Sequence, residues 1–290
     1  MTQIGRRWGP YGLLAPAIVL EAIFVAAPLA VGVYYSFHQV RYFKLGAFVG
    51  FDNYLDALTS ADFLNSVAVT ATFAFFSLFL TFGLGLALAL YLERDSRLNV
   101  FIRASVLVPY MISMMVGSML LKWMFSQDSG LLTILFNSVG IEGFNIIADP
   151  QGAFVALVAN SMWRDSAFAM LLLLAGLKSI PTQLYQAAQV DGSTPLYSFW
   201  RISMPLLRIP ILITIIRLLL HFVNILTYPL ILTAGGPAGA TETIVLRAYR
   251  IGFEDYALGR ANAMAMLLLG FNLVAVALLV FIFKKKDTSI

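Results

Sequence analysis

Six long apolar blocks alternate with polar connections along the 290-residue chain. The blocks cover about residues 11–37, 64–92, 101–124, 153–177, 207–232 and 260–283. Each is long enough for a helix to cross a bilayer, which takes about 20 residues. The pattern predicts an all-α integral membrane protein with six transmembrane helices. One six-span domain would cover residues 11–290, after a short polar N-terminus over residues 1–10.

The composition agrees with a membrane protein. Hydrophobic residues make up 60% of the chain and charged residues 12%, whereas soluble domains carry about 25% charged residues. The chain has no cysteine, which excludes a disulfide framework and a thiolate metal site. Its only histidines are His38 and His221, so a histidine-rich metal site is not expected.

Basic residues are distributed unequally between the two sides that six spans would define. The side with both termini has eleven: two near the N-terminus, three after the second block, three around the fourth connection and three in the C-terminal tail. The opposite side has six. Because Lys and Arg are enriched in cytoplasmic loops, both termini and the connection over residues 179–206 are predicted to be cytoplasmic.

That connection begins with a helical pattern that ends in a turn. Gln186, Ala187 and Ala188 favour a helix. Asp191 and Gly192 form a turn signal that ends it.

A second short helix follows the turn. Thr194 offers a hydroxyl cap, and Pro195 falls at the first helical position, where its missing N–H costs nothing. Leu196, Phe199 and Ile202 are three residues apart and would share one apolar face. The helix is expected to end before Pro205.

This segment resembles the EAA motif of carbohydrate-type ABC importer permeases, the maltose and glycerol-phosphate permease family. The family pattern reads E-A-A-x-x-D-G-A, followed by F-x-x-I-x-L-P. Gln186 stands where the family has Glu, and Ser193 where it has Ala. Residues 49–54 and 232–237 also resemble family stretches, so the resemblance covers nearly the whole chain.

The resemblance implies a type I ABC importer permease fold with cytoplasmic EAA coupling helices, in a bacterial or archaeal plasma membrane. It implies four kinds of partner: a second homologous permease subunit, two ATP-binding cassette subunits that hold ATP and Mg, an external solute-binding protein and the lipid bilayer. No nucleic acid is expected, and no cofactor on this chain. The residues implied in ATPase coupling are Gln186, Ala187, Ala188, Asp191, Gly192, Leu196, Phe199, Ile202 and Pro205.

Motifs that carry covalent chemistry are absent from the sequence. It contains no G-x-x-x-x-G-K-[ST] phosphate loop, no G-x-S-x-G and no H-E-x-x-H. We therefore expect a non-catalytic transport subunit whose energy comes from another chain.

Two sets of polar residues lie inside the apolar blocks, where polar side chains are costly and often functional. Arg217, His221, Asn224 and Tyr228 are spaced four, three and four, which predicts one face of a helix. Asn160, Trp163 and Arg164, with Asp165 beside them, form a second set. Both sets are candidates for a substrate pathway, with Trp163 and Arg164 contacting a sugar ring. The alternative is a structural role, with Arg164 paired to its neighbour Asp165 or with the polar residues forming a helix-to-helix clamp against the partner subunit.

A second function class is an ion-coupled secondary transporter that uses Glu21, Arg164, Asp165 and Arg217 as a relay. It leaves the connection over 179–206 unexplained, and the sequence shows no inverted repeat. The sequence does not choose the substrate, since aromatic and amide groups suit a sugar and Arg217 suits a phosphate. It also leaves open whether substrate contacts this subunit, whether Gln186 weakens coupling, and what Glu21 does.

Overall fold

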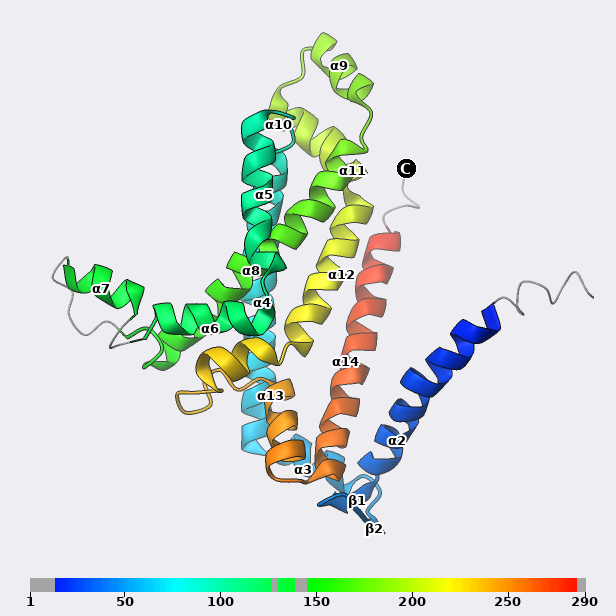
Figure 1. The fold of residues 1–290 in the computed structure, drawn as a ribbon. Coiled ribbons are helices and arrows are strands. Elements are labelled where there is room, and N and C mark those ends of the chain that lie inside the picture. Colours follow the sequence, from blue (N-terminus) through cyan, green and yellow to red (C-terminus); the bar gives the residue numbers. More distant parts are fainter. Residues whose placement is uncertain (1–13, 127–129, 139–144, 286–290) are drawn as a thin grey trace, which may run out of the picture. The chain divides into compact units, whose positions relative to one another are not determined.

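The computed structural model describes residues 14–126, 130–138 and 145–285, and it is predominantly helical (Figure 1). It divides into two compact units. One comprises Met1–Ser60 with Ala248–Gly270, and the other Ala61–Arg247 with Phe271–Ile290. The predicted N-terminus over residues 1–10 lies outside the described residues.

The first unit contains the first apolar helix, Leu14–Ser36, which includes the π-helical turn η1 (Ala22–Ala26) and α2 (Ala27–Ser36). Glu21 is exposed on this helix. An antiparallel hairpin follows, β1 (His38–Arg41) and β2 (Lys44–Phe48), with His38 opposite Phe48 and Arg41 opposite Lys44. The hairpin adds a small sheet to a fold expected to be entirely helical. The unit also holds α3 (Asp52–Thr59), η4 (Arg250–Glu254) and the start of α14 (Leu258–Lys285).

Asn53, in the stretch over 49–54, joins the end of the first helix to the hairpin. Its amide donates to the carbonyl of Ser36 at 2.9 Å and to that of His38 at 3.0 Å. The Tyr54 hydroxyl lies 2.7 Å from Ser36 Oγ. The bond to Ser36 gives a partner to a carbonyl that the helix end would otherwise leave unpaired.

The second unit is built on α4 (Ala61–Tyr91), α8 (Pro150–Lys178) and α12 (Arg208–Asn224), drawn in cyan, green and yellow in Figure 1. Its core gathers the C-terminal parts of α4 and α8 with the start of α12. The fully buried members include Ala89, Leu92, Met170, Leu173 and Leu207. Burial of these side chains holds the three helices together where the connection over 179–206 begins and ends.

Gly85 allows α4 and α8 to approach closely. A Cβ atom at this position would collide with Ala169 of α8, and Ala89, one turn later, is fully buried. Small residues four apart permit such close packing. Gly83, two residues earlier, makes no such close contact, because a Cβ atom there would meet no atom within 4 Å.

Two of the predicted spans are broken. Residues 101–124 form α5 (Arg97–Met111) and α6 (Met114–Met124), bent by 95°, because Ile112 and Ser113 have extended backbone. Residues 207–232 form α12 and the π-helical turn η3 (Pro229–Thr233), with Ile225 extended between them. The described residues also form α7 (Leu131–Ser138) and α13 (Ile244–Tyr249).

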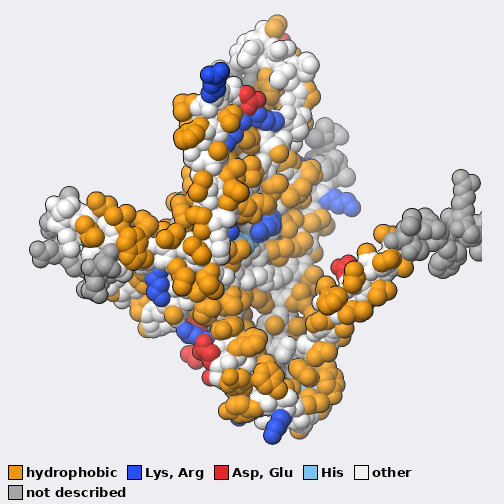
Figure 2. Space-filling model, viewed as in Figure 1, with side chains coloured by type: hydrophobic (Ala, Val, Ile, Leu, Met, Phe, Trp, Pro, Cys, Tyr) orange, Lys and Arg blue, Asp and Glu red, His pale blue; other side chains and the backbone are white. Residues whose placement is uncertain are grey.

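Among the described residues, four helical segments are long and apolar enough to cross a membrane: Leu14–Ser36, Ala61–Tyr91, Arg208–Thr233, which includes the break at Ile225, and Leu258–Lys284. The number rises to six if the α5–α6 pair and the pair of α8 with the following helix are each one span. Hydrophobic side chains cover most of the face shown in Figure 2. Such a surface suits contact with lipid or with a partner subunit.

Candidate functional site

The connection after α8 has the helix–turn–helix form predicted from its sequence. The first helix is α9 (Thr182–Val190). Gly192 then adopts a φ of +75°, and Thr194 Oγ1 accepts from the Tyr197 N–H at 3.3 Å, with Pro195 first in α10 (Pro195–Ser198). Gln186, Ala187 and Asp191 are exposed, and Ala188 is half-buried.

The expected end of the second helix is wrong. Helical structure continues from α10 through the π-helical turn η2 (Phe199–Ser203) into α11 (Met204–Leu206). Pro205 lies inside this continuous helical segment, where it supplies no N–H to the backbone hydrogen bonds. The wider π-helical turn changes which side chains share a face, because residues three apart no longer align.

The exposed apolar side chains of this region therefore differ from the three predicted. Leu196 is 67% exposed, Trp200 59% and Tyr197 55%. Phe199 is half-buried with its ring 5.2 Å from that of Trp200, while Ile202 packs against the core of the second unit. We call Leu196, Tyr197, Phe199 and Trp200 the coupling surface. Trp200 could have been found from sequence, since it is a large apolar residue beside Phe199 in a connection expected to face water.

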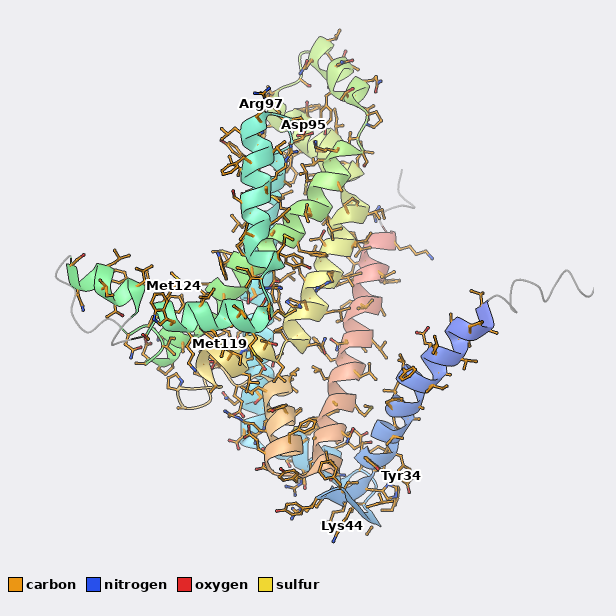
Figure 3. The ribbon with its side chains drawn as sticks, in the orientation of Figure 1. Tyr34, Lys44, Asp95, Arg97, Met119 and Met124 are labelled. Atoms are coloured by element: carbon orange, nitrogen blue, oxygen red, sulfur yellow. The ribbon has the colours of Figure 1, made fainter. Side chains whose placement is uncertain are left out.

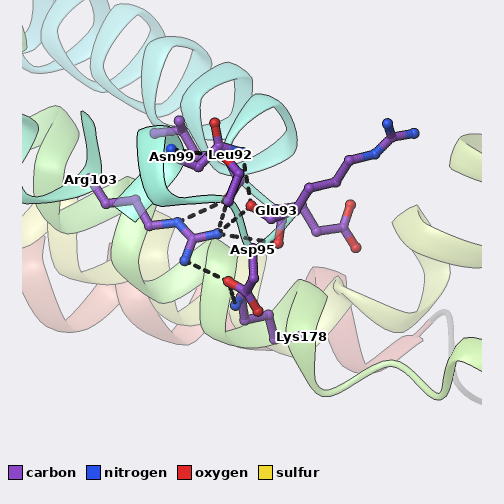
Figure 4. Close-up of polar contacts among 8 residues, drawn as sticks. Leu92, Glu93, Asp95, Asn99, Arg103 and Lys178 are labelled. Atoms are coloured by element: carbon purple, nitrogen blue, oxygen red, sulfur yellow. Dashed lines mark hydrogen bonds and ion pairs between the residues drawn. The ribbon is translucent and has the colours of Figure 1, made fainter. Parts of the chain in front are cut away.

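Polar contacts fix the base of this connection. The Tyr185 hydroxyl on α9 lies 2.8 Å from Ser203 Oγ. Asp95, between α4 and α5, pairs with Lys178 at the end of α8 at 2.6 Å and with Arg103 at 2.9 Å (Figures 3 and 4). The hydrogen bond from Lys178, and to a smaller extent the one from Arg103, holds the pKa of Asp95 below its ordinary value. Arg103 also donates to the Leu92 carbonyl.

A buried polar cluster lies deeper in the second unit, centred on Asp165. Tyr228 donates from its hydroxyl to Asp165 Oδ2 at 2.8 Å, and Arg164 Nη1 lies 3.2 Å from Oδ1. His221 Nε2 is 3.3 Å from Oδ2 but without hydrogen-bond geometry. Tyr228 is fully buried, and Asp165 and Arg164 are nearly so. A carboxylate here is stabilised by a neighbouring cation and a donor, as a buried charge must be.

Arg164 also joins the cluster to the break between α5 and α6. Its Nη2 donates to the carbonyls of Tyr110 at 3.1 Å and Ile112 at 3.3 Å, and its guanidinium lies 5.0 Å from the centre of the Tyr110 ring. These carbonyls lie at the helix end, where backbone acceptors lack partners within the helix. Nothing in the sequence indicates that these two carbonyls accept hydrogen bonds from Arg164.

The two predicted polar sets are only partly brought together. Tyr228 does not share a helix face with Arg217, His221 and Asn224, because α12 ends at Asn224 and Ile225 is extended. The break nevertheless brings the Tyr228 ring to 5.9 Å from that of His221. Asn224 is exposed and exchanges hydrogen bonds with Asn272 of α14.

The remaining candidates have separate surroundings. Asn160 is fully buried and donates to Ser118 Oγ of α6 at 3.0 Å. Trp163 is 37% exposed, so it is separated from the buried Arg164 with which it was expected to contact a sugar. Arg217 is half-buried, with its guanidinium 5.0 Å from the centre of the Phe168 ring. In this structure the contacts of Arg164 are with Asp165 and with the end of α5.

Residues 80–287 match the family model described as the binding-protein-dependent transport system inner membrane component. The chain belongs to this family. It is therefore a multi-pass permease subunit of an inner-membrane transport system.

Curated relatives extend the match over nearly the whole permease. The trehalose/maltose transport system permease protein MalF of Thermococcus litoralis is 32% identical over 268 residues, 91% of each chain. The sn-glycerol-3-phosphate transport system permease protein UgpA of Agrobacterium fabrum is 32% identical, covering 95% of this chain and 93% of that one. The sulfoquinovosyl glycerol transport system permease protein SmoG of the same organism is 30% identical, covering 95% and 90%.

The fold matches that of a solved ABC transporter. The crystal structure of a bacterial ABC transporter that imports the acidic polysaccharide alginate aligns with a TM-score of 0.86, covering 97% of each chain at 23% identity. At that identity the likeness concerns the fold, which is the type I importer permease fold.

Proposed function

We propose that this chain is the membrane subunit of an ATP-driven importer for a sugar, an oligosaccharide or a glycerol derivative such as glycerol phosphate. The names of the relatives support this substrate class, since they concern trehalose and maltose, glycerol phosphate and a glycerol glycoside. The chain would form the translocation pathway with a second homologous permease and would perform no covalent chemistry. ATP and Mg would be held by two partner ATPase subunits, and an external binding protein would deliver the substrate.

The observation that carries the coupling role is the exposed apolar surface of the connection after α8. Leu196 and Trp200 are 67% and 59% exposed on a segment of short helices fixed at its base by polar contacts. Large apolar side chains left exposed on such a segment mark an interaction site. An ATPase subunit that held this surface would transmit its closure through α8 and α12 to the spans.

The orientation is part of the proposal. The excess of basic residues on the side of both termini supports a cytoplasmic position for the termini and the coupling surface. A reporter fused after Ile290 should be cytoplasmic, and one inserted near Gly236 should be external.

The surroundings of Arg217 support the proposal that the substrate carries an anionic group. Within the described part of the chain Arg217 makes no ion pair, although it is half-buried and stacks on Phe168. A cation at such a depth in a membrane protein is costly without a partner. A phosphate or carboxylate on the substrate would supply one.

Uptake into vesicles that contain the complete transport system tests the proposal. Maltose, trehalose and sn-glycerol 3-phosphate would be compared with and without ATP, and with a protonophore. We expect uptake of at least one to require ATP and to survive the protonophore. Uptake that stops with the protonophore and continues without ATP would favour the ion-coupled secondary transporter instead.

A further inference from the structure

The hairpin of the first unit has an unusual turn. Tyr42 and Phe43 join β1 to β2, with φ values of +48° and +61°. A two-residue turn with both φ values positive is normally made by Asn-Gly or a similar pair, because a side chain with a Cβ atom resists this conformation. Two bulky aromatic residues are therefore held in an unfavourable backbone conformation, which suggests that their side chains have a use.

These aromatic side chains are displayed together with a third. Tyr42 and Phe43 are 68% and 69% exposed. The Tyr42 N–H donates to the Tyr256 carbonyl at 3.0 Å, and the two rings stack with centroids 5.5 Å apart. Tyr256 also has a positive φ, of +54°, and lies 6.0 Å from the Phe43 ring. Phe43 has no polar atom to favour its exposure to water, so a less polar surface must contact it.

The position of the turn indicates which surface that is. β1 begins two residues after the helix Leu14–Ser36, and Tyr256 lies two residues before α14. Both helices are long and apolar enough to span a membrane. The aromatic cluster is thus continuous with the ends of two helices that could span a membrane. Amphipathic aromatic rings are enriched at the membrane–water interface, where such helices end.

Two cations flank the aromatic pair. Arg41 and Lys44 are directly opposite in the ladder, both are exposed, and neither makes an ion pair among the described residues. Lys44 is labelled on the hairpin in Figure 3. Like charges directly opposite on a hairpin destabilise it unless an anion lies between them. We propose that the tip Arg41–Lys44, with Tyr256, inserts into the headgroup layer and binds the phosphate of an anionic lipid between Arg41 and Lys44.

Spin labelling tests this proposal, and the absence of cysteine makes it simple. Leu45→Cys, beside the tip and 51% exposed, would carry a nitroxide label. Val190→Cys, 89% exposed on α9, would serve as the aqueous reference. The full chain, purified without ATPase subunits so that position 190 stays in water, would be placed in phosphatidylcholine nanodiscs with and without phosphatidylglycerol. Collision rates with oxygen and with a water-soluble nickel complex would then be measured.

We expect the ratio of oxygen to nickel collisions to be several-fold higher at position 45 than at position 190, and to rise with phosphatidylglycerol. The pair Arg41→Gln and Lys44→Gln should abolish that rise. The double variant Tyr42→Asn with Phe43→Gly keeps the turn with residues that favour it, so it should unfold at the same or a higher temperature while the ratio at position 45 falls.

Equal collision ratios at positions 45 and 190 would overturn the proposal. So would a label at position 45 that loses contact with the nickel complex only when the external binding protein is added. That second outcome would assign the tip to protein docking.

Discussion

Tyr228 donates a hydrogen bond of 2.8 Å to Asp165 Oδ2 and so joins two residues that are 63 positions apart. Asp165 also pairs with Arg164, which reaches the broken end of α5. One carboxylate therefore connects α8, the segment after α12 and the α5–α6 break. Hydrogen bonds between buried side chains of membrane helices stabilise packing by roughly 0.6 kcal/mol on average and up to about 1.7 kcal/mol.

We expect Tyr228→Phe to destabilise the protein by about 1 kcal/mol, because Asp165 keeps Arg164 as a partner. Asp165→Asn should cost more, about 3–5 kcal/mol, because it leaves the Arg164 charge buried without a counter-charge. Thermal unfolding in detergent measures both. Tyr91→Phe, at a residue 72% exposed on α4, is the matched control and should change little. Equal effects of Asp165→Asn and Tyr228→Phe would contradict the central role of Asp165.

Arg164→Lys tests the contact at the helix break. A lysine presents one ammonium and cannot reproduce the planar fork that contacts Asp165 and two carbonyls at once. The angle between α5 and α6 should therefore become more variable. Spin labels at Phe101→Cys and Met119→Cys, both exposed, would show a broader distance distribution. Arg97→Lys, at an exposed arginine, should leave the distribution unchanged, and an unchanged distribution in Arg164→Lys would refute the contact's role.

The helices and the helix–turn–helix connection were predictable because their signals are local: long apolar runs, a Gly turn and a Thr-Pro start. The breaks were not, because they depend on distant partners. Nothing near Ile112 reveals that Arg164 donates a hydrogen bond to the carbonyl freed there. Likewise, the spacing of Arg217, His221 and Tyr228 suggested one helix face, whereas Tyr228 meets His221 across a break and is held by Asp165.

Asp95 provides a prediction for pH. Lys178 and Arg103 hold its pKa below the ordinary value, so its stabilising effect is complete above about pH 4 and is lost as the pH falls through the lowered pKa. Asp95→Asn should therefore lower the unfolding temperature at pH 7, and the difference from wild type should shrink as the pH falls below about 4.

The effect of Asp95 should also shrink in high salt, because the carboxylate is exposed. Glu93→Gln is the matched control, since Glu93 makes no ion pair among the described residues. A difference for Asp95→Asn that stayed constant from pH 7 to pH 3 would show that the carboxylate charge is not responsible.

Substitutions on the coupling surface, compared with one in the core, can distinguish an effect on ATPase docking from an effect on folding. Trp200→Ala and Phe199→Ala should each weaken ATPase binding, by about 2 kcal/mol or more for a residue central to the interface. Ile202→Ala should instead lower stability, because Ile202 packs against the core. The measurements are ATPase subunit content after purification, substrate-stimulated hydrolysis and the unfolding temperature. Loss of ATPase content in Ile202→Ala alone would remove Leu196, Phe199 and Trp200 from the docking role.

Substitutions of Gly192 can distinguish an effect on the shape of the turn from an effect on its contacts with the ATPase. The φ of Gly192 is +75°, and a Cβ atom there would meet nothing within 4 Å, so a substitution acts through the backbone alone. Gly192→Val should therefore distort the turn and reduce ATPase content and uptake, because a β-branched residue strongly resists a positive φ. Gly192→Asn should preserve most of both, since asparagine tolerates this conformation. Equal losses in the two variants would mean that the partner contacts Gly192 itself, where any side chain is excluded once the ATPase is bound.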